Sequence, residues 1–167
     1  GGSGIGESCA ATFARSGAKV IVADYDKDGG NRVTEAIRAE NLEATFVAVD
    51  VSKPEEIEAM VGRTVETYGG LDVAVNNAGI GGAQATTGEY PIDSWQQVIE
   101  VNLSGVFYCM RHEIPAMIAS GGGAIINMAS LPDTKLIQPG SMYEAKYRIK
   151  LPPQQDAAAV AKTLEAQ

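Results

Sequence analysis

Apolar segments of strand character alternate with amphipathic helical segments along most of this chain, and this alternation constrains the fold more than any other feature. The strand segments are 18–23, 44–49, 71–76 and 124–129. The helical segments are 7–16, 28–40, a helix beginning near 52, and 93–119. Such alternation is typical of βαβ units, so it predicts an α/β fold with a parallel sheet.

The third strand segment ends abruptly in two amides and a glycine, Asn76-Asn77-Ala78-Gly79. Turn residues of this kind mark the carboxyl end of a strand. Ligands of open α/β sheets bind at such ends, where the strand order reverses. We therefore interpret Asn76–Gly79 as a binding rim.

Length and charge limit the classes of partner. The 167 residues suffice for one domain, and the net charge of -8 disfavours nucleic acid and anionic membrane surfaces as partners. We find no apolar run near the roughly 20 residues that cross a bilayer and no leader-like opening. The expectation is a cytoplasmic protein.

Neither the cysteines nor the histidine suggests a metal site. Cys9 and Cys109 lie in predicted helices among apolar neighbours and are interpreted as small buried hydrophobes. His112 has no second ligand at a suitable spacing. We expect no metal.

A glycine-rich segment leads directly into the first helix. It contains Ser3, Gly4, Ile5 and Gly6. Glycines let the backbone approach a phosphate at a helix N-terminus, whose free N–H groups favour an anion. Flexible termini are also rich in glycine, so the interpretation depends on the helix and strand after this segment.

An acidic residue lies at a suggestive distance from these glycines. Asp24-Tyr25 ends the next strand, and Asp24 lies 18 positions after Gly6 (24 − 6). This is close to the spacing at which a carboxylate accepts hydrogen bonds from an adenosine ribose, and a carboxylate there repels a 2′-phosphate. The pattern therefore favours NAD over NADP. The alternative interpretation is that Asp24 is an ordinary acidic loop residue with no role in cofactor binding.

Three further features have more than one interpretation. Asp50-Val51 ends the second strand, and Asp50 could contact an adenine amine or hold the turn. Ser52-Lys53-Pro54-Glu55 is interpreted as a capping box. Asn102, in the middle of a helix that is apolar on more than one face, is a deliberate polar feature or a mild defect.

Together these residues resemble the short-chain dehydrogenase/reductase family, whose members transfer a hydride between NAD(P) and a carbonyl or alcohol on a Rossmann-type fold. The matching pieces are Ser3–Gly6, Asp24, Asp50-Val51, Asn76–Gly79, Asn102 within 101–107, and 127–130. They run from Gly1 to about Lys146 in the family's order. The resemblance implies a doubly wound parallel sheet, a small alcohol or ketone substrate and a homo-oligomer, a dimer or tetramer.

The resemblance also assigns catalytic roles. It makes Ser130 the group that polarises the substrate carbonyl, Tyr143 the proton donor or acceptor, and Asn102 a support for the proton relay. Ser130 and Tyr143 lie 13 apart, as in the family, and Tyr147 fits worse. A phenol pKa near ~10 must fall by about three units, roughly 4 kcal/mol. One ammonium ~4 Å away, at an effective dielectric of ~20, supplies that much, and Lys146 is the candidate.

Parts of the chain depart from the family pattern. Tyr143 and Lys146 are one residue closer together than the usual Tyr-x-x-x-Lys, and Pro152-Pro153 ends any helix begun there. We therefore predict a partial dinucleotide-binding domain over 1–146 and a divergent helical tail over 147–167. The sheet is expected to be incomplete, without the family's first strand between 20–24 and 71–76 and without its last strands. Loss of the first strand would leave a gap of roughly 10 Å, or make the flanking strands pair directly.

The sequence is consistent with three hypotheses. The first is an NAD-dependent oxidoreductase acting on a hydroxyl or carbonyl of a small organic substrate. The second is a truncated, catalytically inactive module with partial nucleotide binding. The third is an interaction protein that uses the apolar helix 93–119 for association.

Overall fold

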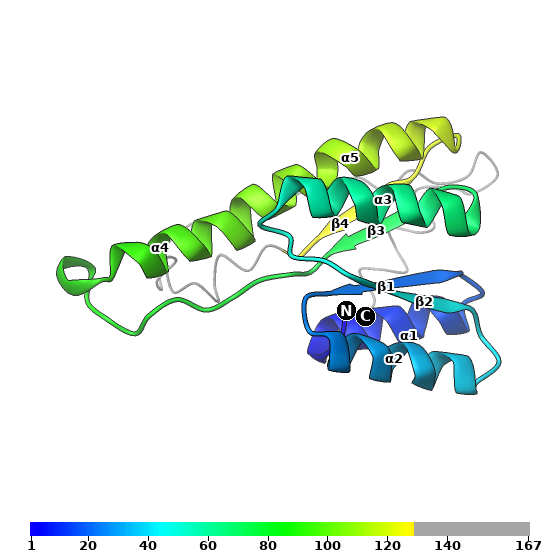
Figure 1. Cartoon of the computed structure of the whole chain (residues 1–167), viewed down its shortest axis with the longest axis horizontal. Coiled ribbons are helices and arrows are strands. Elements are labelled where there is room, and N and C mark those ends of the chain that lie inside the picture. Colours follow the sequence, from blue (N-terminus) through cyan, green and yellow to red (C-terminus); the bar gives the residue numbers. More distant parts are fainter. Residues whose placement is uncertain (129–167) are drawn as a thin grey trace, which may run out of the picture.

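A computed structural model describes residues 1–128, in which helices and strands alternate as predicted (Figure 1). The strands are β1 (Val20–Asp24), β2 (Ala44–Ala48), β3 (Val73–Asn76) and β4 (Ala124–Asn127). The helices are α1 (Gly4–Arg15), α2 (Lys27–Ala39), α3 (Pro54–Tyr68), α4 (Ile92–Ile99) and α5 (Gly105–Ala119), with the short segments η1 (Thr87–Glu89) and η2 (Glu100–Ser104). The predicted α/β class is confirmed.

All strand pairs in the described residues are parallel. β1 pairs with β2, with Val20 opposite Ala44, and β3 pairs with β4, with Asn76 opposite Asn127. Helices α1 and α2 lie on one side of the β1–β2 pair, and α3 and α5 lie together on the other side (Figure 1). This is the doubly wound, Rossmann-type arrangement, and it brings the carboxyl ends of the strands to one edge.

The sheet is divided into two two-stranded parts, β1–β2 and β3–β4, within residues 1–128. All residues of β1 and β3 line a single cavity of about 1580 Å³. The expectation that no strand of this chain lies between them is confirmed for the described residues, and β1 and β3 do not pair directly. Val73 is 40% exposed although its pattern predicts a buried strand, because its strand has a neighbour only at β4.

The buried core has two parts. One joins α1, α2 and the β1–β2 pair, and the other includes Val49, Ile57 and Cys109. The interpretation of Cys109 as a buried hydrophobe is confirmed. Cys9 is only partly buried, because α1 turns Ala10 and Ala14 inward instead.

The segment predicted as one helix over 93–119 consists of α4, a π-helical turn at η2 and α5. The π-helical turn contains Asn102, so the mid-helix asparagine lies at a local change in helix geometry. In Figure 1, α4 and the loop before it extend away from the rest of the molecule. No helix within residues 1–128 combines the length and apolarity needed to cross a membrane.

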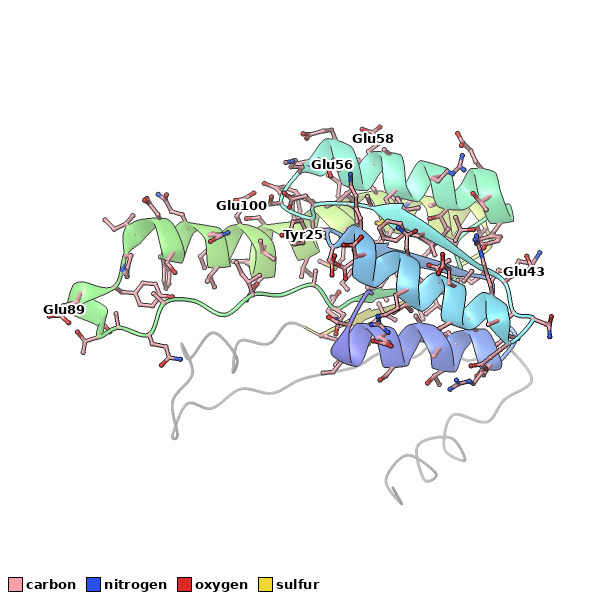
Figure 2. The ribbon with its side chains drawn as sticks, turned by 60° about the horizontal axis from the view of Figure 1, so that its bottom comes forward. Tyr25, Glu43, Glu56, Glu58, Glu89 and Glu100 are labelled. Atoms are coloured by element: carbon pink, nitrogen blue, oxygen red, sulfur yellow. The ribbon has the colours of Figure 1, made fainter. Side chains whose placement is uncertain are left out.

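The acidic residues labelled in Figure 2 lie on several parts of the fold. Figure 2 labels Glu43 between α2 and β2, Glu56 and Glu58 on α3, Glu89 before α4, and Glu100 at η2. Apart from Glu56 and Glu58, the labelled glutamates thus come from different parts of the chain.

Candidate functional site

The glycine-rich segment and the asparagine rim meet, although they are about 70 residues apart in sequence. A Cβ atom at Gly6 would lie 3.0 Å from Asn77 Nδ2 and 3.0 Å from Gly1 N. Only a residue without a side chain fits there without displacing its neighbours. The predicted notch therefore exists, and its wall includes Asn77.

The amino end of α1 opens onto this notch. The helix begins at Gly4, earlier than the predicted Glu7, and Ser3 precedes it without a side-chain capping bond. The first N–H groups of a helix have no partner within the helix and are available to an anion. The observed backbone thus provides the donors that a phosphate requires.

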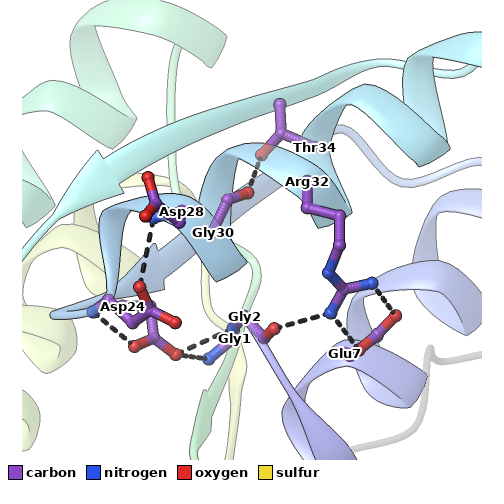
Figure 3. Close-up of polar contacts among 9 residues, drawn as sticks. Gly1, Gly2, Glu7, Asp24, Asp28, Gly30, Arg32 and Thr34 are labelled. Atoms are coloured by element: carbon purple, nitrogen blue, oxygen red, sulfur yellow. Dashed lines mark hydrogen bonds and ion pairs between the residues drawn. The ribbon is translucent and has the colours of Figure 1, made fainter.

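Asp24 lies at the carboxyl end of β1 and organises the start of the chain (Figure 3). Its Oδ2 accepts hydrogen bonds from the Gly1 and Gly2 nitrogens at 2.8 Å each, and its Oδ1 accepts one from Asp26 N at 2.9 Å. Burial alone would raise the pKa of Asp24, but these hydrogen bonds outweigh burial and hold the pKa below its ordinary value. Asp24 is therefore a carboxylate near neutral pH.

A second set of contacts fixes the glycine loop, residues 1–3 before α1, from the other side. Arg32 Nη2 donates to the Gly2 carbonyl oxygen at 3.0 Å, and the same guanidinium makes two bonds to Glu7 at 2.7 and 2.8 Å (Figure 3). The loop is thus tied to both α1 and α2. Arg32 was not predicted as a site residue, because residues 25 to 30 positions apart carry no local spacing signal.

Asp50 holds the turn after β2. Its Oδ1 accepts bonds from Ser52 N at 3.0 Å and from Ser52 Oγ at 2.7 Å, and the Ser52 hydroxyl bond lowers the pKa of Asp50 most. The capping-box prediction is wrong: Lys53 occupies the N-cap position and forms no side-chain cap, since the Ser52 hydroxyl is used by Asp50. A contact of Asp50 with adenine stays a prediction.

The Asn102 side chain binds the backbone of the loop that follows the rim. Its Oδ1 accepts from Ile80 N at 2.9 Å, and its Nδ2 donates to Ile80 O at 3.0 Å. Asn102 is therefore a deliberate polar feature. Its support of a proton relay stays a prediction.

A partly buried polar cluster joins the ends of β3 and β4. Asn76 Nδ2 donates to Glu113 Oε2 and to Asn127 Oδ1, both at 3.0 Å. Glu113 lies on α5 and is 3% exposed. Glu113 was not among the predicted site residues, although a glutamate on an apolar helix face is a signal that could have identified it.

Most of the predicted cofactor-binding residues line one cavity. Its lining includes Ser3, Gly6, Asp24, Tyr25, Asp50, Val51, Asn77, Ala78 and Gly79, whereas Gly4 and Ile5, in the first turn of α1, do not line it. The predicted Ser130, Tyr143 and Lys146, the rival Tyr147 and the tail 147–167 lie outside the described residues. Among residues 1–128, no group of three or more His, Cys, Asp or Glu side chains is arranged to hold a metal ion.

Comparison with known proteins agrees with this geometry. The family described as short chain dehydrogenase matches residues 1–146. An uncharacterized oxidoreductase of Thermotoga maritima is 43% identical over 141 residues, which are 81% of this chain and 55% of the relative. A cyclohexanol dehydrogenase of Acinetobacter sp. is 42% identical over 144 residues, 86% of this chain and 57% of the relative.

A solved structure supports the same assignment. The crystal structure of a 3-ketoacyl-ACP reductase from Sinorhizobium meliloti has a TM-score of 0.73 and 32% identity, covering 75% of this chain and 49% of that chain. The chain belongs to the short-chain dehydrogenase/reductase family, an enzyme family whose members use a nicotinamide dinucleotide. It spans about half the length of the curated relatives that it matches.

Proposed function

We propose that this chain is the dinucleotide-binding part of an NAD(H)-dependent oxidoreductase that acts on a hydroxyl or carbonyl group of a small organic substrate. The observation that carries this proposal is the meeting of the glycine loop, the ionised Asp24 and Asn77 at one cavity. The names of the relatives, which include dehydrogenases of cyclic alcohols, support the substrate class.

The donor set fits a dinucleotide. The uncapped amino end of α1 offers N–H groups to the pyrophosphate, and the small Gly6 leaves room for the backbone to approach it. The Asp24 carboxylate suits ribose hydroxyls and opposes a 2′-phosphate, which favours NAD over NADP. When bound, the nicotinamide accepts or supplies the hydride.

Proton transfer is assigned to residues beyond the rim. We propose that Ser130 polarises the substrate oxygen and that Tyr143 gives it a proton in reduction and takes the proton back in oxidation. Lys146 lowers the pKa of the Tyr143 phenol, and Asn102 fixes Ile80 beside the site. The net reduction adds the hydride to the carbonyl carbon and the proton to its oxygen.

The rival proposal is a module that binds nucleotide without turnover. The open cavity between β1 and β3 favours it, because binding residues held by two separate half-sheets are less well preorganised. Both proposals expect NAD to bind the chain as given, and Trp95, which lines the cavity, provides a fluorescence signal. Saturable quenching with NADH oxidation on a ketone panel supports the enzyme, quenching without turnover supports the module, and absence of quenching contradicts both.

We propose a homo-oligomer formed through a second copy of this chain. Leu103, Phe107, Ile114 and Ile118 are 64%, 56%, 46% and 71% exposed. Their spacing of four, seven and four places them on one face of η2 and α5, and a stripe of large apolar side chains can pair with itself about a two-fold axis.

We assign the protein to the cytoplasm, where NAD is available and free cysteines such as Cys9 and Cys109 are typical.

Replacement of Ile118 with glutamate is expected to convert a dimer into a 17.5 kDa monomer, or a tetramer into dimers, because it places a charge in the apolar stripe. Light scattering measures the mass directly. Ala119→Glu is the matched control, since it adds the same charge one position away from the stripe. A monomeric wild-type chain, or equal dissociation by both variants, would contradict this interface.

A further inference from the structure

Glu113 is an acidic side chain buried below the rim, and none of the catalytic roles proposed above uses it. It is 3% exposed on α5, which packs against β3. A carboxyl group in such surroundings requires a hydrogen-bond partner, and Asn76 Nδ2, at 3.0 Å from Oε2, provides it. Burial raises the pKa of Glu113, and the bond from Asn76 opposes part of that rise.

Asn76 connects this carboxyl group to the neighbouring strand. The same Nδ2 atom donates to Asn127 Oδ1 at 3.0 Å, so both of its hydrogens are used, one toward α5 and one toward β4. The Asn127 amide contacts Met110 Sδ of α5 at 3.5 Å. Three elements thus meet around one amide group.

The positions of these residues in the chain give the cluster its importance. Asn76 directly precedes the rim residue Asn77, and Asn127 lies three residues before Ser130. Where the strands end, Met128 N donates to Asn76 O at 2.9 Å. Asn76 therefore connects the rim to the end of β4, the strand that precedes Ser130 in the sequence.

We propose that Glu113 is a positioning residue that, through Asn76, holds the carboxyl ends of β3 and β4 together and sets the position of Asn77–Gly79, the rest of the rim. Its benefit to cofactor binding rests on the proposed function, whereas its hold on the strand ends does not. Cys109, one turn earlier on α5, is the titratable neighbour that interacts with it. Burial and the charge of Glu113 raise the pKa of this thiol to about 12, so it stays protonated.

The test compares Glu113→Leu, which removes the acceptor, with Glu113→Gln, which keeps an oxygen for Asn76. Hydrogen exchange of the Met128 amide is expected to be about tenfold faster in Glu113→Leu, and within about threefold of wild type in Glu113→Gln. Met117→Leu replaces an apolar residue on the same buried face and is expected to leave this exchange unchanged. NAD affinity is expected to fall about tenfold in Glu113→Leu and to recover in Glu113→Gln.

A second variant removes the other partner of the bond. Asn76→Ala is expected to accelerate Met128 exchange as Glu113→Leu does, and adding Glu113→Leu to Asn76→Ala is expected to produce no further change. If Glu113→Leu fails to fold, Asn76→Ala and Glu113→Gln still decide the question.

Unchanged Met128 exchange in Glu113→Leu or Asn76→Ala, or additive effects of the two, would overturn the role of Glu113. The same holds if Glu113→Gln is as defective as Glu113→Leu. Absence of NAD binding by the wild-type chain would count against the proposed function alone, since the exchange measurement needs no cofactor.

Discussion

Replacement of Asp24 with asparagine is expected to weaken NAD binding by about 10- to 150-fold, because hydrogen bonds to a charged group contribute about 1.5–3 kcal/mol. Three acceptor positions of the carboxylate bind the nitrogens of Gly1, Gly2 and Asp26, and we propose that the fourth accepts a hydrogen bond from a ribose hydroxyl. Asparagine loses the charge and half of the acceptor capacity. The glycine loop is therefore expected to loosen at the same time.

The matched control is Asp28→Asn, which removes the same charge from the exposed first turn of α2. NADP affinity is expected to fall less than NAD affinity in Asp24→Asn, since the carboxylate no longer repels a 2′-phosphate. Fluorescence titration with both nucleotides measures the ratio. Equal losses in the two asparagine variants, or an unchanged ratio of NAD to NADP affinity, would contradict the role of Asp24.

The same variant has a pH signature. The folded-state pKa of Asp24 lies below its ordinary value near 3.8, so ionised Asp24 stabilises the fold above that ordinary value. This stabilisation is lost as the pH falls from the ordinary value through the lower folded-state pKa. When the free energy of unfolding is measured as the pH falls, Asp24→Asn is expected to lack the loss that comes from protonation of Asp24. Asp28→Asn is expected to keep that loss.

Much of this fold could be predicted because strand ends carry a local signal. The strand that ends in Asp24 and the strand that ends in Asn76 are each parallel to a partner strand, and in an α/β fold the carboxyl ends of parallel strands lie at one edge. The contact between Gly6 and Asn77 results from that topology, and no side-chain detail is needed.

The features that the sequence did not predict depend on side-chain contacts between residues far apart in the chain. The bonds from Arg32 to Gly2 and from Asn76 to Glu113 join residues 30 and 37 positions apart. No periodicity encodes such pairs. The failed capping box has a similar cause, since Ser52 could bond either to the helix or to Asp50, and tertiary structure decided between them.

Replacement of Gly6 with valine is expected to reduce NAD affinity by about 10- to 150-fold and stability by about 1–3 kcal/mol, the usual cost of overpacking. The new Cβ would lie 3.0 Å from Gly1 N and 3.1 Å from Gly1 Cα, so the glycine loop, which is backbone, would have to move. The added methyl groups would also occupy space beside Asn77. Gly6→Ala adds the Cβ alone and is expected to produce a smaller loss of the same kind.

Gly62→Ala is the matched control. Gly62 lies within α3, and a Cβ there meets no atom within 4 Å. Alanine is expected to stabilise the fold by up to about 1 kcal/mol through its helix propensity and to leave NAD affinity unchanged. Chemical denaturation and NAD titration measure the two quantities separately. If Gly6→Val bound NAD as tightly as Gly62→Ala, the pyrophosphate could not lie against the glycine loop, and the cofactor site would have to be sought elsewhere in the cavity.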